Sequence, residues 1–250
     1  MERIVLVHGS IVGGRATWRE QRRAIADEAD LVVLERPGFA PGPVEDVDFD
    51  RHADWVAERL ERGDHLVGHS YGGVICLLAA ARQRPRDTLA SLTVIEPPCT
   101  SVALHDPEVA AFARGGAELY ASGRTLAPEV FLRHFLTAVG SDWDPPSPLP
   151  PELEQGVEAL IRERGPWEAE IPLGDLAALG IPTLVVSGAH HPAYEAICDV
   201  LERELGAARV VIPGYGHNPQ LSTTFTAALL DLVDRGAALR DPDEGARDPV

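Results

Sequence analysis

Gly68-His69-Ser70-Tyr71-Gly72 lies where a short apolar run, residues 65–67, ends and a longer one, residues 74–78, begins. The first run has the length of a buried strand and the second continues as a helix, so the five residues between them form a sharp turn. Such a turn holds its serine in a strained conformation with the hydroxyl exposed, and a Cβ at either flanking glycine would clash. The G-x-S-x-G pattern is weak by itself. In this context it predicts that Ser70 is a nucleophile.

Two other loops follow apolar runs of strand length. Ile4-Val5-Leu6-Val7 leads into the glycine-rich stretch 8–14, and Arg209-Val210-Val211-Ile212 leads into residues 213–218, which contain Gly-Tyr-Gly-His217. The carboxyl ends of parallel strands meet at one edge of a sheet, where ligands bind. We therefore expect the first loop to present a backbone N–H toward Ser70, and His217 to reach its hydroxyl.

Strand and helix patterns alternate along most of the chain. The apolar runs lack strict alternation, as strands buried on both faces do, and each intervening helix fills a crossover, so parallel βαβ units are predicted. The predicted strands are Ile4–Val7, Leu31–Leu34, His65–Gly68, Leu92–Ile95, Thr183–Val186 and Arg209–Ile212. The predicted helices are Ala16–Glu28, Asp50–Arg62, Gly72–Arg84, Pro107–Ser122, Pro128–Val139, Pro151–Arg164 and Thr223–Asp234.

These motifs and their order resemble the α/β-hydrolase family, from Ile4 to about Leu232. The turn Arg36-Pro37-Gly38-Phe39 after the second strand is also common in that family. The resemblance implies an α/β-hydrolase fold, with a mostly parallel sheet, helices on both faces and an inserted helical cap. It implies hydrolysis of a small, partly apolar ester or lactone through an acyl-Ser70 intermediate, and no cofactor.

The domain organisation follows from one break in the spacing of the strands. Far more residues than a crossover needs separate Ile95 from Thr183, and their patterns are helical apart from the proline-rich connector 144–151. We predict an α/β-hydrolase core at residues 1–98 and 179–240 and a helical cap at residues 99–178 that covers the nucleophile. Its aromatic residues would line the site or form the cap's own core (Tyr120, Phe131, Phe135, Trp143 and Trp167). The polar segment 241–250 is predicted to be a disordered tail.

The remaining roles in the site come from the resemblance and from general chemistry. His217 is expected to act as the general base, because an imidazole titrates at about pH 6.5 and so transfers protons in both directions at neutral pH. The oxyanion hole is expected to consist of the backbone N–H of Tyr71, at the start of a helix, and that of Ser10. In similar hydrolases, histidines placed like His8 and His69 support the loops, and we assign them that role.

The third expected catalytic residue is an acid that would orient His217 and so complete a triad with Ser70. Its position in this chain departs from the family pattern. Most members carry an Asp after the strand before last, but residues 187–192 contain no carboxylate. A minority place the acid one strand earlier, where this chain has Glu96 at the end of the strand Leu92–Ile95. We therefore predict that Glu96 orients His217. Glu195, Asp199 and the absence of any carboxylate partner are the alternatives.

Composition narrows the classes of partner. The 250 residues include 39 acidic and 22 basic side chains, a net charge of −17 that argues against nucleic acid and anionic membranes as partners. We expect a small-molecule substrate and a cytoplasmic protein, since neither a signal segment nor a membrane span is evident. The sequence leaves the oligomeric state open.

Cys76, Cys99 and Cys198 have no spacing typical of disulfides or zinc. The adjacent His190 and His191 fit a loop or a substrate contact better than a metal site.

Two other functions fit the same sequence. The Ser70 and His217 pair could run a non-hydrolytic reaction, as in a lyase or a natural-product cyclase, for which a weakened triad would suffice. Alternatively, the chain could be a ligand-binding protein of hydrolase descent. Reaction of Ser70 with a fluorophosphonate, together with turnover of a generic ester, would favour the hydrolase.

Overall fold

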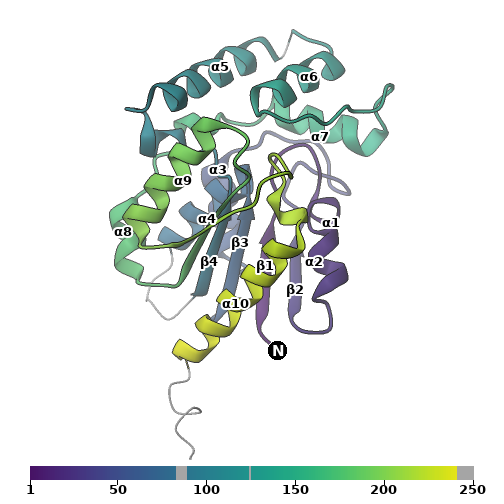
Figure 1. The fold of residues 1–250 in the computed structure, drawn as a ribbon. Helices are drawn as coiled ribbons and strands as arrows, with labels where there is room; N and C mark the ends of the chain where they lie inside the picture. The colour runs from purple at the N-terminus through teal and green to yellow at the C-terminus, as the bar shows by residue number, and fades with distance from the viewer. Residues whose placement is uncertain (83–88, 124, 241–250) are drawn as a thin grey trace, which may run out of the picture.

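The described residues form a central sheet of six strands, and every neighbouring pair is parallel (Figure 1). The structure is a computed structural model that describes residues 1–82, 89–123 and 125–240, so the predicted tail 241–250 lies outside the described residues. The strand order is β2-β1-β3-β4-β5-β6, which confirms the predicted α/β-hydrolase fold class. The strands are β1 Arg3–Val7, β2 Asp30–Leu34, β3 Asp64–His69, β4 Leu89–Ile95, β5 Thr183–Ser187 and β6 Ala208–Val211.

Helices cover both faces of the sheet (Figure 1). Successive side chains of β1 enter different cores, with Ile4 and Leu6 on one face and Val5 and Val7 on the other. This is the period of two that a strand buried on both faces requires. One face packs on α1 Gly14–Thr17, α2 Arg19–Ala24 and α10 Thr223–Arg240; the other packs on α3 Phe49–Ala57, α4 Tyr71–Ala81, α8 Leu173–Leu179 and α9 Pro192–Leu205.

The predicted single helix Ala16–Glu28 is wrong. The chain forms the short helices α1 and α2, and Trp18 between them has the non-helical angles φ −104° and ψ 23°. The Trp18 side chain is fully buried in the core that also contains Phe225 and Leu229 of α10. The break in the helix therefore coincides with a large aromatic side chain that packs beneath it.

The segment between β4 and β5 supplies helices of its own, and we call residues 99–178 the helical insert. Its helices α5 Pro107–Gly123, α6 Pro128–Ala138 and α7 Pro151–Ile161 lie together at one end of the sheet (Figure 1). They share a separate hydrophobic core, which Ile11 of the loop after β1 joins. Because that loop follows the carboxyl end of a strand, the helical insert packs at the edge where Ser70 lies. Within the described residues, no helix combines the length and apolar character needed to cross a bilayer.

Candidate active site

Ser70 lies at the turn between β3 and α4 with a positive φ of 54° and ψ of −125°. A non-glycine residue is strained in this region of backbone space, and such strain persists only where the surrounding structure holds it. Both flanking glycines are required by close contacts. A Cβ on Gly68 would lie 2.4 Å from the Gly72 carbonyl oxygen, and one on Gly72 would lie 2.4 Å from that of His8. The local sequence therefore specifies the tight turn.

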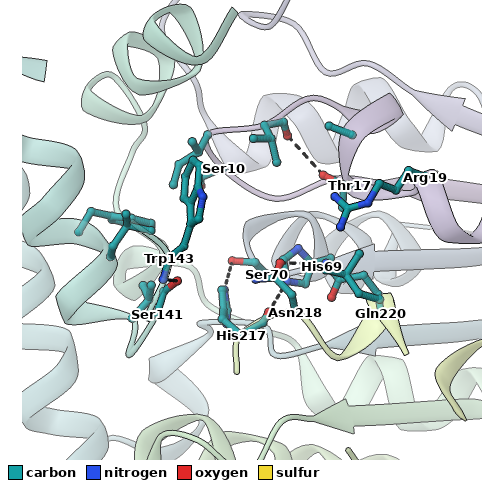
Figure 2. Close-up of a pocket in the computed structure, with 17 residues that line it drawn as sticks. Ser10, Thr17, Arg19, His69, Ser70, Ser141, Trp143, His217, Asn218 and Gln220 are labelled. Carbon is teal, nitrogen blue, oxygen red and sulfur yellow. Dashed lines mark hydrogen bonds between the residues drawn. The ribbon is translucent and has the colours of Figure 1, made fainter. Parts of the chain in front are cut away.

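Ser70, His217 and Glu96 form a continuous chain of hydrogen bonds. His217 Nε2 is 2.9 Å from Ser70 Oγ, and His217 Nδ1 is 2.7 Å from Glu96 Oε2. Figure 2 shows the serine hydroxyl facing the imidazole. Ser70 and His217 are 7% and 8% exposed, so solvent reaches the pair, whereas Glu96 is completely buried. In the tautomer that donates an Nδ1 proton to the carboxylate, His217 accepts the hydroxyl proton at Nε2.

The carboxylate of Glu96 is held by groups on three sides. Its Oε1 accepts a hydrogen bond of 2.6 Å from the Gly188 N–H, and its Oε2 faces His217. Burial by itself would raise the pKa of Glu96, but the imidazoles of His190 and His217 outweigh it and lower the pKa to about 2. The backbone of Glu96 has a positive φ of 46°. Glu96 is therefore an ionised acceptor at neutral pH, on a strained turn like that of Ser70.

The alternative acids pair elsewhere. Glu195 accepts hydrogen bonds from Ser187 and Arg209, at 2.9 and 2.7 Å. Asp199 lies 3.8 Å from the same arginine and is largely exposed. Both carboxylates are thus part of a group on α9 and β6, and Glu96 is the carboxylate that lies against His217.

His190 brings a second imidazole to Glu96. Its Nδ1 lies 3.3 Å from Glu96 Oε1, an ion-pair contact without hydrogen-bond geometry, and its Nε2 is 3.0 Å from the Val139 carbonyl. Burial opposes its charged form, but Glu96 and the Val139 carbonyl together raise the pKa of His190. His190 therefore connects the Glu96 carboxylate to the end of α6. His191 makes a different contact: its Nδ1 accepts a hydrogen bond from the Ala193 N–H at the start of α9.

Glu96, His190 and His217 also offer ligand atoms that lie within 4.8 Å of one another. Neutral imidazoles and a carboxylate are zinc ligands, so the donor types would suit such an ion. Both nitrogens of His217 are already engaged, one with Ser70 and one with Glu96. A cation bound by all three side chains would therefore break the contacts of His217.

The loop after β1 is held by a buried carboxylate of the helical insert. Ser10 Oγ donates a 2.6 Å hydrogen bond to Glu163 Oε2, and Arg36 lies 3.3 Å from Glu163 Oε1. Arg36 also donates to the Gly9 carbonyl at 2.7 Å. Burial raises the pKa of Glu163, and the charge of Arg36 opposes that shift. These contacts fix the backbone of residues 9 and 10 beside Ser70.

The residues that carry the two predicted oxyanion donors line the same cavity as Ser70. Ser10 and Tyr71 both line it, and neither of their amides donates a hydrogen bond to another group in the described part of the chain. Tyr71 is also anchored to the helical insert, because its hydroxyl donates to the Arg164 carbonyl at 2.9 Å. Adjacent residues of the insert, Glu163 and Arg164, thus hold both loops that carry the free amides.

His8 and His69 lie where supporting residues would be. His8 Nε2 accepts the Arg36 N–H at 3.0 Å, while His69 Nε2 donates to the His217 carbonyl at 2.7 Å. Burial lowers the pKa of His8 well below its usual value, and burial together with the charge of His217 lowers the pKa of His69 to about 3. Both imidazoles are neutral at physiological pH and fix neighbouring backbone.

Two cavities meet at Ser70, and we call them the outer and inner pockets. The outer pocket has a volume of about 380 Å³ and includes Trp143 and His217 in its wall (Figure 2). The inner pocket, of about 40 Å³, includes Tyr120 and Trp167. Phe135 lines both, whereas Phe131 belongs to the core of the helical insert.

Sequence reasoning missed Glu163 and Arg36 as parts of the site, and it assigned His190 to a loop or a substrate contact rather than to a contact with Glu96. Glu163 follows an amphipathic helix and shows no local signal, since its partners lie up to 153 residues away. Arg36 was noted only within its turn. His190 stands in the loop that lacks the usual Asp, and that departure from the family pattern was a signal that it lies close to the partner of His217.

Comparison with known proteins agrees with this architecture. Residues 4–229 match the model of the Alpha/beta hydrolase family. MenH from S. aureus superposes with a TM-score of 0.68 at 16% identity, covering 94% of both chains. A thermophilic esterase from Thermogutta terrifontis gives 0.64 at 23% identity, covering 94% of this chain and 90% of the esterase. NosK from Streptomyces actuosus gives 0.64 at 21% identity, covering 94% and 99%. A search of curated proteins found no significant match.

The family match spans most of the chain, so this protein belongs to the alpha/beta hydrolase family and is an enzyme of that family. The solved structures are less than 25% identical to it, and their likeness shows the shared fold.

Proposed function

Taking membership of this family as the premise, we propose that the protein is a serine hydrolase that cleaves a small, partly apolar carboxylic ester or lactone through an acyl-Ser70 intermediate. The observation that carries the proposal is the unbroken hydrogen-bond chain from Ser70 through His217 to Glu96, with distances of 2.9 and 2.7 Å. A serine hydroxyl is a weak nucleophile unless an adjacent base takes its proton, and this chain supplies that base.

The proposed reaction has two steps. Ser70 Oγ bonds to the carbonyl carbon of the ester while its proton moves to His217 Nε2, and the tetrahedral intermediate then breaks its carbon–oxygen bond to the alcohol. His217 returns the proton to the departing alcohol oxygen. A water molecule then attacks the acyl-enzyme with the same proton transfers, which releases the carboxylic acid and restores the Ser70 hydroxyl.

Charge develops at two places during these steps, and the site has a group for each. The carbonyl oxygen becomes an oxyanion, for which the free amides of Ser10 and Tyr71 are the proposed donors. His217 becomes an imidazolium, which the buried carboxylate of Glu96 stabilises through Nδ1. The helical insert acts as the cap in this proposal, since its residues line the inner pocket beside Ser70.

Hydrolysis has more support than the two alternative functions. The absence of an acid in residues 187–192 was the reason to consider the non-hydrolytic alternative. Glu96 lies against His217 and can serve as that acid, so this reason no longer applies. A binding protein would have no need of a strained serine, a paired base and two free amides in one place.

The decisive test is Ser70→Ala, which removes only the attacking atom. We expect kcat for a p-nitrophenyl ester to fall by about 10⁴-fold or more with the fold intact. A fluorophosphonate should label the parent protein at Ser70 and leave the variant unlabelled. A folded variant that still hydrolyses the ester at about a tenth of the parent rate would refute the mechanism. Labelling without turnover by the parent would favour the non-hydrolytic or binding functions.

A further inference from the structure

The inner and outer pockets differ greatly in size although they share the serine. Ser10, Ser70, Phe135 and Val139 line both, so the two pockets adjoin at the reacting hydroxyl. Their volumes are about 380 Å³ outside and about 40 Å³ inside. An ester has two parts on opposite sides of its carbonyl carbon. The question is which part faces which pocket.

The positions of His217 and Tyr71 indicate which part of the ester faces which pocket. His217 lines the outer pocket, and Tyr71 lines the inner one. The departing alcohol oxygen must lie within hydrogen-bond reach of His217 Nε2, because that nitrogen returns its proton. The alcohol part therefore leaves through the outer pocket. The acyl part extends into the inner pocket, which Tyr71, one of the two proposed oxyanion donors, lines.

One wall of the inner pocket, formed by Trp167 and Tyr120, is fixed by tight packing. The Trp167 ring lies so close to Gly116 of α5 that a Cβ there would be 2.7 Å from Cζ3, and Tyr120 meets the same ring edge-on at a centroid distance of 5.0 Å. Tyr120 is in turn held by its hydroxyl, 3.4 Å from Glu163. A long chain could enter only if these aromatic rings moved together, and closely packed interiors resist such a shift.

The two pockets also differ in chemistry. Apolar side chains such as Phe112, Leu119 and Ala138 surround the inner pocket. The outer pocket includes the polar side chains of Arg19 and Asn218, and in Figure 2 Arg19 and Trp143 lie on opposite sides of Ser70. Trp143 is 44% exposed, so this pocket opens to solvent.

We propose that the inner pocket binds the acyl group and admits only a short apolar one, of about two to four carbons, while the outer pocket accepts a larger and more varied alcohol. This assignment rests on the function proposed above. A volume of about 40 Å³ corresponds to roughly three water-sized positions, because one such position needs about 10–15 Å³.

The test varies one part of the ester at a time. A series of p-nitrophenyl esters from acetate to octanoate should give a maximum of kcat/KM at two to four carbons and a fall of about 100-fold or more at eight, since the longer chain has no space. Acetates of alcohols of increasing size should differ by about tenfold or less. Intact-protein mass spectrometry should show the acetyl or butyryl adduct on Ser70 forming faster than the octanoyl adduct.

Matched variants locate the effect. Leu119→Ala enlarges the inner pocket and should move the optimum to a longer acyl chain. Leu221→Ala removes the same atoms from the outer pocket and should leave that optimum where it is. Ala138→Leu fills the inner pocket and should restrict the enzyme to acetate, which gives a second test if the first variant does not fold.

The outcomes separate this inference from the proposed function. Ser70-dependent hydrolysis with a flat acyl profile, with a maximum at eight carbons, or with discrimination in the alcohol series alone would overturn the pocket assignment and leave the serine hydrolase standing. If no ester is hydrolysed and none acylates Ser70, both proposals fail.

Discussion

Two buried glutamates, Glu96 and Glu163, show how the surroundings of one residue type can give it two different roles. Glu96 ends β4 and accepts from the Gly188 amide and His217, while Glu163 belongs to the helical insert and accepts from Ser10 beside Arg36. The pKa of Glu96 is lowered to about 2, against the effect of burial, by contacts with two imidazoles. Burial raises the pKa of Glu163 despite its arginine partner.

The difference concerns what each carboxylate touches. Glu96 contacts a group that changes its charge during the proposed reaction, so its negative charge acts on the transition state. Glu163 contacts a hydroxyl and a permanent cation, so it fixes the position of the loop that carries the Ser10 amide. Neutralising Glu96 should therefore lower kcat, with an effect on stability that depends on pH, whereas neutralising Glu163 should act mainly on folding stability.

The largest expected effect is that of Glu96→Gln. Removal of the charge that stabilises the His217 imidazolium should lower kcat by up to about 10⁴-fold with little change in KM. The control is Glu195→Gln, which neutralises a nearby carboxylate that pairs with Arg209 instead; kcat should change by about threefold or less. Steady-state kinetics of both variants test the assignment. Equal losses of kcat in the two would contradict it.

For Glu163→Gln we expect a loss mainly in stability. The substitution leaves Arg36 buried without its charge partner, which costs about 3–5 kcal/mol of unfolding free energy. Urea denaturation measures this loss, and Arg36→Met in the same chain should recover part of it. Ser10→Ala removes only the hydroxyl contact and should cost about 1 kcal/mol. A Glu163→Gln variant as stable as the parent protein would show that the pair of Arg36 and Glu163 contributes little to stability.

The pH dependence of stability should sharpen the comparison. The folded-state pKa of Glu96 is about 2, below its usual value of 4.5, so its contribution is present above pH 4.5 and is lost as the pH falls toward 2. The pKa of Glu163 is raised, so Glu163 gives no such loss of stability as the pH falls from 4.5 to 2. Glu96→Gln should therefore remove a loss of up to roughly 3 kcal/mol between these pH values. Denaturation curves of both proteins that run parallel from pH 4.5 to 2 would be inconsistent with this account.

The smallest expected effect concerns His190, which faces Glu96, His217, His191, Glu195 and the Val139 carbonyl. Because its pKa is raised above 6.5, its contribution is complete below pH 6.5 and is lost as the pH rises through the folded-state value. A protonated imidazole at the end of α6 contributes about 1 kcal/mol. Thermal melts should show that His190→Gln removes this dependence above pH 6.5, and an unchanged dependence would assign it to another group.

The sequence predicted the parts of the site that local turns encode. Three turns are each set within a few residues: the one around Ser70, the loop after β1 and the segment Gly-Tyr-Gly-His217. The alternation of strands and helices places all three at one edge of a parallel sheet. Glu96 was predicted from the resemblance to a minority of the family, with Glu195 and Asp199 as alternatives. Its 2.7 Å contact with His217 is the geometry that this prediction required, and its catalytic role stays a proposal.

Only the tertiary structure decided which distant groups meet. The contact between Glu96 and His217 spans 121 residues, and that between Ser10 and Glu163 spans 153. The bend of the chain at Trp18, the contact of His190 with Glu96 and the unequal volumes of the two pockets likewise depend on the packing of separate elements. A turn is governed by short-range sterics and therefore appears in the sequence, whereas the pairing of buried charges and the size of a cavity depend on how whole helices and strands pack.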